Sequence, residues 1–214
     1  MGRKVAGVIA VIGWASLILQ FVLHMTNAIV PEPTMLERFI RFFSYFTITT
    51  NMIVAATLTA IAFFPETRFG RFASKPSTQA AVASYITIVG VVYSLFLRGV
   101  WAPVGWQAVA DHALHDVMPL LAIGYWFVFS PKSGIGLADV GKWLIYPIVY
   151  VVYSLVRGAF VDWYPYWFVD VTQFGYPKSL TNTGFVLIAF AVVGFIYFGL
   201  AKLFSRNAAA APAG

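Results

Sequence analysis

Six long apolar stretches, separated by short polar segments, account for most of the sequence. They run over residues 5–25, 42–64, 80–97, 108–129, 140–156 and 184–200. An α-helix needs roughly 20 apolar residues to cross a hydrocarbon core about 30 Å thick. The pattern therefore predicts an all-α membrane protein, a bundle of about six transmembrane helices joined by short loops.

Proline and glycine mark several of the breaks between these stretches. The segment Pro31-Glu32-Pro33 predicts a turn after the first stretch, and residues 36–41 predict a short interfacial approach to the second. Pro147 predicts a kink in the fifth stretch. The longest loop is expected over 157–183, and the alanine-rich segment 207–214 is expected to be a disordered tail.

Composition narrows the class of protein further. Of 214 residues, 60% are hydrophobic and only 10% are charged, whereas soluble domains carry about 25% charge. We therefore expect residues 1–206 to form a single multi-pass membrane domain. The first stretch is longer than a signal-peptide core, so we expect it to remain as a span. The absence of cysteine excludes disulfides and thiolate metal sites.

The basic residues favour one orientation in a cell membrane. A net charge of +6 does not indicate nucleic-acid binding here, because no basic stripe with interleaved aromatic residues occurs. Nine Lys and Arg residues fall in one set of alternate loops and termini, and five fall in the other. The positive-inside rule places the first set in the cytoplasm, together with both chain termini. The first set is Arg3, Lys4, Arg68, Arg71, Lys75, Lys132, Lys142, Lys202 and Arg206; the second is Arg38, Arg41, Arg98, Arg157 and Lys178.

In this topology the histidines gather at the non-cytoplasmic ends of the spans. His24 ends the first span, His112 and His115 begin the fourth, and Arg98 and Arg157 end the third and fifth. Ionisable groups within a membrane are costly and usually line an internal cavity. We therefore expect a site near the non-cytoplasmic face.

The segment 111–116 carries two carboxylate–imidazole pairs at helical spacing. Asp111 can reach His115, and His112 can reach Asp116, because residues four apart share a helix face. A carboxylate in this position orients an imidazole as an acid or base. Two other interpretations stay open: polar capping of a helix end, or a metal site formed by His112 and His115 with His24 or Glu37. No motif supplies the further metal ligand, so we expect no metal and no cofactor.

A second polar group lies at the start of the second span. Ser44, Thr47 and Asn51 share one helix face, and Thr50 lies close by. A hydroxyl beside an imidazole can act as a nucleophile. Such side chains also commonly join membrane helices through hydrogen bonds. Arg98 and Arg157 are either interfacial anchors or ligands for a carboxylate or phosphate group.

Four segments resemble the androgen-induced-gene family of membrane proteins, as a bacterial-type member. They are residues 43–51, 111–115, 118–120 and 164–165, and the resemblance spans nearly the whole chain. The vertebrate branches of this family are multi-pass threonine hydrolases that cleave fatty acid esters of hydroxy fatty acids. The resemblance therefore implies a membrane-embedded hydrolase with a lipid substrate.

The resemblance also implies roles for individual residues. His115 matches the catalytic histidine, which is the second in an Asn-His-x-x-His element, and Asp111 stands where the vertebrate branches have Asn. Thr47 matches the threonine nucleophile. A second alignment, anchored on Asn51, places Ile48 at that position or shifts the role to Thr50.

The pattern and the resemblance together predict an intramembrane lipid-ester hydrolase. Thr47 attacks the ester carbonyl, His115 accepts its proton and Asp111 orients His115. Ser44 or Asn51 is expected to stabilise the oxyanion. The alternative is a non-catalytic protein that binds or transports a lipid or another small molecule, and the sequence indicates no oligomeric state. The other residues expected to contact the substrate are Thr50, His112, Arg98, Arg157 and His24.

Overall fold

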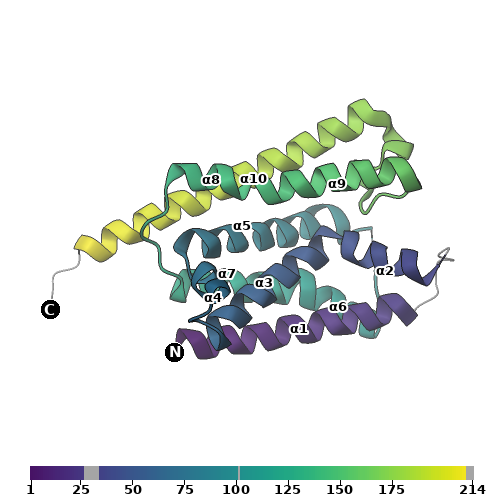
Figure 1. The fold of residues 1–214 in the computed structure, drawn as a ribbon. Coiled ribbons are helices and arrows are strands. Elements are labelled where there is room, and N and C mark those ends of the chain that lie inside the picture. Colours follow the sequence, from purple (N-terminus) through teal and green to yellow (C-terminus); the bar gives the residue numbers. More distant parts are fainter. Residues whose placement is uncertain (27–33, 101, 211–214) are drawn as a thin grey trace. The chain divides into compact units, whose positions relative to one another are not determined.

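The computed structural model describes residues 1–26, 34–100 and 102–210, with side chains up to Arg206 (Figure 1). The described residues form helices joined by turns, with no strand among them. The turn predicted at Pro31-Glu32-Pro33 lies outside the described residues. The last helix ends at Ala210, inside the segment predicted to be a disordered tail, and residues 211–214 are not described.

Five helical segments in the described part of the chain are long and apolar enough to cross a membrane. They are Gly2–Thr26, Phe46–Phe63, Pro76–Leu97, Leu137–Val161 and Val171–Arg206. The predicted fourth span is helical from Trp106 to Phe129, but a π-helical segment divides it into shorter parts. The described part of the chain is thus all-helical, with five candidate membrane spans.

The chain forms two compact units. The N-terminal unit is Met1–Ser133 and the C-terminal unit is Gly134–Gly214. The helices of the N-terminal unit are α1 (Gly2–Thr26), α2 (Met35–Ser44), α3 (Phe46–Phe63), α4 (Arg68–Ala73), α5 (Pro76–Val92), the π-helix η1 (Tyr93–Leu97), α6 (Trp106–His112), the π-helix η2 (Ala113–Val117) and α7 (Met118–Phe129). Those of the C-terminal unit are α8 (Leu137–Trp143), α9 (Ile145–Val161), the 3-10 helix η3 (Trp167–Val169) and α10 (Val171–Ala210).

Small residues hold the helices of the N-terminal unit close together. Helix α1 packs against α3, and α5 packs against both α3 and α7. At Gly13 of α1, an added Cβ would lie 2.9 Å from Met118 Cε and 3.2 Å from Ala55 Cβ. Close backbone approach of this kind is the usual means by which helices associate in lipid.

The second predicted span divides at Tyr45. The sequence placed this boundary near Arg41, but α2 continues to Ser44 and α3 begins at Phe46, with an extended backbone at Tyr45. Phe42 packs edge-on against Phe21 of α1, with ring centroids 5.1 Å apart, and this contact ties the end of α2 to α1. The prediction that Ser44 shares a helix face with Thr47 and Asn51 was therefore wrong.

In the C-terminal unit, the break associated with Pro147 lies one turn earlier than predicted. Helix α8 ends at Trp143 and α9 begins at Ile145. Proline lacks an N–H and its ring collides with the carbonyl four residues before it, which here belongs to Trp143. The helical hydrogen bonding is thus interrupted at Leu144.

The long loop predicted over 157–183 is mostly helical. Helix α9 extends to Val161 and α10 begins at Val171, with a bend at Gly175, whose φ of 71° is readily adopted only by glycine. Gly158 allows the Tyr164 ring to pack directly on α9, since an added Cβ would lie 2.0 Å from that ring. Aromatic composition alone could not distinguish this packed helical connection from a loop.

Candidate active site

Thr47 and His115 meet inside the N-terminal unit. Thr47 lies in the first turn of α3 and His115 lies in η2, and Thr47 Oγ1 is 3.3 Å from His115 Nε2. Thr47 is only 9% exposed. The structure therefore brings together the hydroxyl and the imidazole that the sequence singled out, from positions 68 residues apart.

The other ring nitrogen of His115 faces Asp111. His115 Nδ1 is 3.0 Å from the Asp111 carbonyl oxygen and 3.2 Å from its carboxylate Oδ1. A carbonyl oxygen can only accept a hydrogen bond, so in the neutral ring Nδ1 carries the proton and donates it. Nε2 then presents its lone pair to the Thr47 hydroxyl. This is the tautomer that a general base needs.

Tyr93 completes this arrangement and was not identified from the sequence. Its hydroxyl donates to Asp111 Oδ2. Its ring stacks on the His115 ring, with centroids 4.0 Å apart and planes 13° apart. The sequence signal that could have identified it is its position five residues before Arg98, at the end of the third span expected to lie beside the histidines of the first and fourth spans.

Two π-helical segments place these rings side by side. Tyr93 begins η1, and His115 lies in the middle of η2. π-Helical turns are rare and occur frequently at functional sites. Gly90 of α5 packs closely beside the second segment: an added Cβ would lie in ordinary contact with the His115 carbonyl oxygen, at 3.5 Å, and in a tight contact with Pro119 Cβ of α7, at 3.3 Å.

Asn51 has a different role from the one expected. Its Nδ2 donates to the carbonyl oxygens of Thr47, at 2.9 Å, and of Leu114, at 3.2 Å. Both amide hydrogens are thus used, and the side chain is fully buried, so Asn51 is not an oxyanion donor. It instead connects the backbone at Thr47 to the residue before His115.

Ser44 was the other expected oxyanion donor. Its hydroxyl donates to the Ile40 carbonyl oxygen at 2.8 Å, within α2, and its side chain is 1% exposed. A hydroxyl has one hydrogen to donate. The structure therefore does not support an oxyanion role for Ser44.

A second polar cluster lies at the more exposed edge of the site. Asp116 accepts hydrogen bonds from Arg98 and from His112 Nδ1, the latter at 2.8 Å. The Arg98 guanidinium also lies over the Tyr93 ring, 4.8 Å from its centroid. The hydrogen bond to Asp116 raises the pKa of Arg98 above its ordinary value. Both carboxylate–imidazole pairs predicted from the spacing are therefore present, and Arg98 and His112 already share a carboxylate.

Of the remaining predicted site residues, His24 and Arg157 pack against aromatic rings and Thr50 is buried. His24 Nε2 lies 3.0 Å from the Arg38 carbonyl oxygen, and its ring packs against Phe42 at the α1–α2 corner. Thr50 is fully buried, with no exposed surface for a substrate. Arg157 belongs to the C-terminal unit, where its guanidinium lies 4.9 Å from the centroid of the Trp163 ring.

The metal interpretation finds no support in the described part of the chain. No three His, Asp or Glu side chains gather there in an arrangement that could hold a metal ion. Glu37, one of the expected further ligands, instead pairs with Arg41, with 2.9 Å between Oε1 and Nε. The imidazole of His115 is engaged by Thr47 and Asp111.

Comparisons with family models, with curated proteins and with solved structures found no match to this chain.

Proposed function

We propose that the protein is an intramembrane hydrolase of lipid esters, with Thr47 as nucleophile and His115 as general base. One observation carries the proposal: Thr47 Oγ1 lies 3.3 Å from His115 Nε2, while Nδ1 of the same ring is held by Asp111. A nucleophile, a base and a group that orients the base are the recurring elements of acyl-transfer sites.

The proposed reaction has two steps. Thr47 Oγ1 forms a bond to the ester carbonyl carbon while His115 Nε2 accepts its proton, and the alcohol then leaves with that proton. Water next attacks the acyl-threonine ester and gives a proton to His115. The Thr47 oxygen takes this proton as it leaves, which releases the carboxylic acid.

Local electrostatics support these steps. Thr47 lies in the first turn of α3, where the positive end of the helix dipole favours negative charge on its oxygen. Asp111 is 5% exposed, so its carboxylate interacts with the His115 imidazolium in an environment with little water. Thr50 has no exposed surface, whereas Thr47 has the observed contact to Nε2, which favours Thr47 as the nucleophile.

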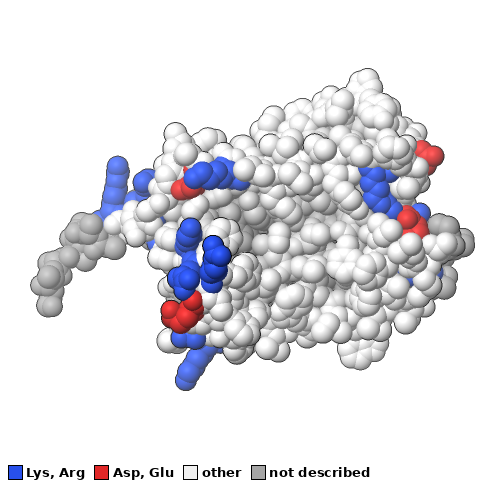
Figure 2. All heavy atoms as spheres, viewed as in Figure 1, with Lys and Arg blue, Asp and Glu red and all other residues white. Residues whose placement is uncertain are grey.

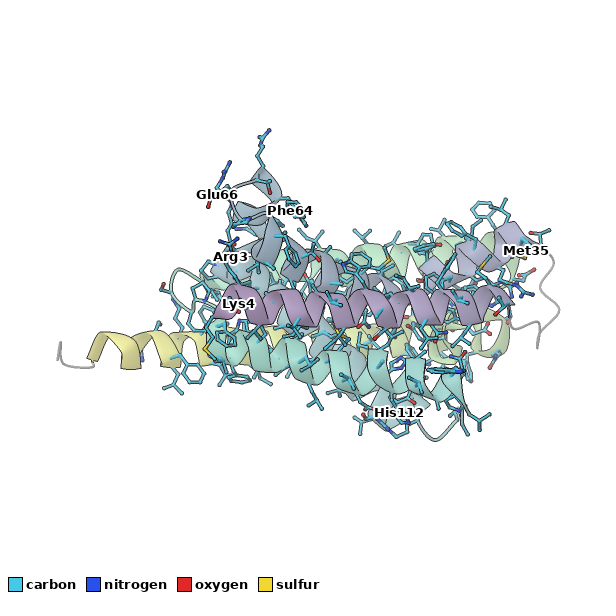
Figure 3. All side chains as sticks on the ribbon, turned by 90° about the horizontal axis from the view of Figure 1, so that it is seen from below. Arg3, Lys4, Met35, Phe64, Glu66 and His112 are labelled. Carbon is cyan, nitrogen blue, oxygen red and sulfur yellow. The ribbon has the colours of Figure 1, made fainter. Side chains whose placement is uncertain are left out.

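The proposed substrate is a fatty acid ester of a hydroxy fatty acid or a similar lipid ester. It rests on two supports: the apolar helices around the site, and the resemblance to the androgen-induced-gene family, which assigns the same roles to Thr47 and His115. We further propose that residues 106–129 form a sixth span in a cell membrane, with both termini cytoplasmic and the site near the opposite face. Figure 3 shows His112 towards the end of the N-terminal unit opposite to Arg3 and Lys4.

Purified protein incubated with a panel of branched lipid esters tests the proposal. Thr47→Val removes the hydroxyl and preserves the shape of the side chain, so hydrolysis should fall by about 10³-fold or more. Thr49→Val is the matched control, because the Thr49 hydroxyl bonds to the backbone carbonyl oxygens of Tyr45 and Phe46 at the start of α3. A fluorophosphonate probe should label Thr47, and this labelling should be lost in His115→Ala.

Two results would contradict this function. Hydrolysis that survives in both Thr47→Val and His115→Ala would exclude the proposed chemistry. Lipid binding without turnover in the wild-type protein would favour the alternative, a non-catalytic lipid-binding or transport protein.

A further inference from the structure

A second candidate lipid site lies at the end of the N-terminal unit opposite to His112. An open groove of about 780 Å³ runs along the first turns of α1 and the end of α3. Figure 3 shows Arg3 and Lys4 at the start of α1. The residues that line it are Met1, Arg3, Lys4, Gly7, Val8, Val11, Ile12, Ala62 and Phe63.

Gly7 lets the Phe63 and Ala62 side chains of α3 pack close to α1 in the lining of the groove. An added Cβ there would lie 3.2 Å from Phe63 Cζ and 3.5 Å from Ala62 Cβ. Val8, Val11 and Phe63 are all more than half exposed. The groove is therefore apolar along its length, and its apolar side chains are available to a ligand.

Its polar end is positively charged and partly fixed in position. Arg3 donates from Nε and Nη2 to the Ala62 carbonyl oxygen, at 3.3 and 3.0 Å. These bonds use two of the five N–H donors of the guanidinium and hold it at the mouth of the groove. Lys4 is exposed beside it. On the visible face of the N-terminal unit, charged side chains collect towards the helix ends and leave the middle uncharged (Figure 2).

We propose that this groove binds one anionic phospholipid of the surrounding membrane. Its headgroup phosphate lies against Arg3 and Lys4, and an acyl chain lies along Val8, Val11 and Phe63. The distance from Arg3 to Ile12 along α1 is roughly 13 Å at 1.5 Å per residue, close to half of a hydrocarbon core about 30 Å thick. Basic pockets between helices on the cytoplasmic side are the usual sites for anionic headgroups, and this end carries the residues that favour a cytoplasmic location.

Native mass spectrometry of the full chain in detergent tests the headgroup contact. Phosphatidylglycerol and phosphatidylcholine with the same acyl chains are added separately, and retained lipid is counted. Wild-type protein should retain phosphatidylglycerol preferentially. Arg3→Gln combined with Lys4→Gln should weaken its binding by about 30-fold, the equivalent of about 1 kcal/mol for each basic residue. Lys142→Gln combined with Lys202→Gln changes the net charge equally in the C-terminal unit and should leave binding unchanged.

A second pair of variants tests the acyl-chain contact. Val11 and Ile18 lie on the same helix and are 62% and 61% exposed, but only Val11 lines the groove. Val11→Trp should reduce phosphatidylglycerol binding, and Ile18→Trp should not. Equal retention of the two lipids, equal effects of the two tryptophans, or full competition by inorganic phosphate would each overturn the proposal.

Discussion

Asp111→Asn best separates the catalytic contributions of the two groups that contact His115 Nδ1, the Asp111 carboxylate and the Asp111 backbone carbonyl. It removes the negative charge but keeps the size of the side chain. The asparagine oxygen can accept from Nδ1, and its amide can donate to the Tyr93 hydroxyl, which accepts as well as donates. The backbone carbonyl of residue 111, 3.0 Å from Nδ1, is unaffected. The fold and the tautomer of His115 should therefore persist.

The magnitude follows from what remains after the substitution. Where a carboxylate alone fixes the tautomer of the base, its replacement by an amide lowers kcat by about 10⁴-fold. Here the carbonyl oxygen also fixes the tautomer, so the loss is that of one charged hydrogen bond. Such a bond contributes about 1.5–3 kcal/mol, which corresponds to a loss of about 10- to 200-fold in kcat/KM.

The assay is ester hydrolysis by purified variants, with thermal unfolding measured in parallel. Asp116→Asn is the matched control, because Asp116 lies in η2, which directly follows the helix of Asp111, but pairs with His112 and Arg98. It should change kcat/KM by less than about fivefold. A loss near 10⁴-fold for Asp111→Asn would refute the role given to the backbone carbonyl. No loss would refute the interaction between Asp111 and the reacting imidazole.

Three further outcomes are expected. Tyr93→Phe keeps the ring that stacks on His115 but removes the hydroxyl from Asp111. In the same assay kcat/KM should fall by about 2- to 13-fold, the equivalent of the 0.5–1.5 kcal/mol of an ordinary hydrogen bond, with KM unchanged. Gly13→Leu forces a side chain into the contact with Met118 and Ala55 and should destabilise the protein by about 1–3 kcal/mol. Thermal unfolding should show this as a lower Tm. A Tm equal to that of the wild type would contradict the packing described. Hydrolytic activity should survive thorough treatment with a chelator. Activity that is lost on chelation and recovered on adding Zn²⁺ would instead restore the metal interpretation.

The sequence predicted those features that depend on local periodicity. Apolar length located the helices, and the spacing of 111–116 predicted the pairing of Asp111 with His115 and of His112 with Asp116. The approach of Thr47 to His115 is a long-range contact. The prediction of this contact came from placing both residues at the same end of two spans. Such a placement gives the depth of each residue in the membrane, but not the face of the helix on which its side chain lies.

The features that the sequence did not predict depend on tertiary packing. No proline or glycine marks the break at Tyr45, and aromatic contacts between α1 and α2 accompany it. Nothing local indicates that η1 and η2 become π-helical. Without them, neither the stacking of Tyr93 on His115 nor the position of Asn51 between two carbonyl groups could be inferred.

The surroundings of Thr47 and His115 favour chemistry over a purely structural hydrogen bond. Joining two helices needs only a hydroxyl and one acceptor. Here the protein also buries a carboxylate beside the imidazole, and the desolvation of such a group costs several kcal/mol. It adds the Tyr93 ring and hydroxyl and two π-helical segments. The Asn51 amide also holds the backbone at Thr47 and at Leu114, the residue before His115. These groups hold one imidazole in one orientation with its lone pair on one hydroxyl. That constraint adds little to stability and is what a general base requires.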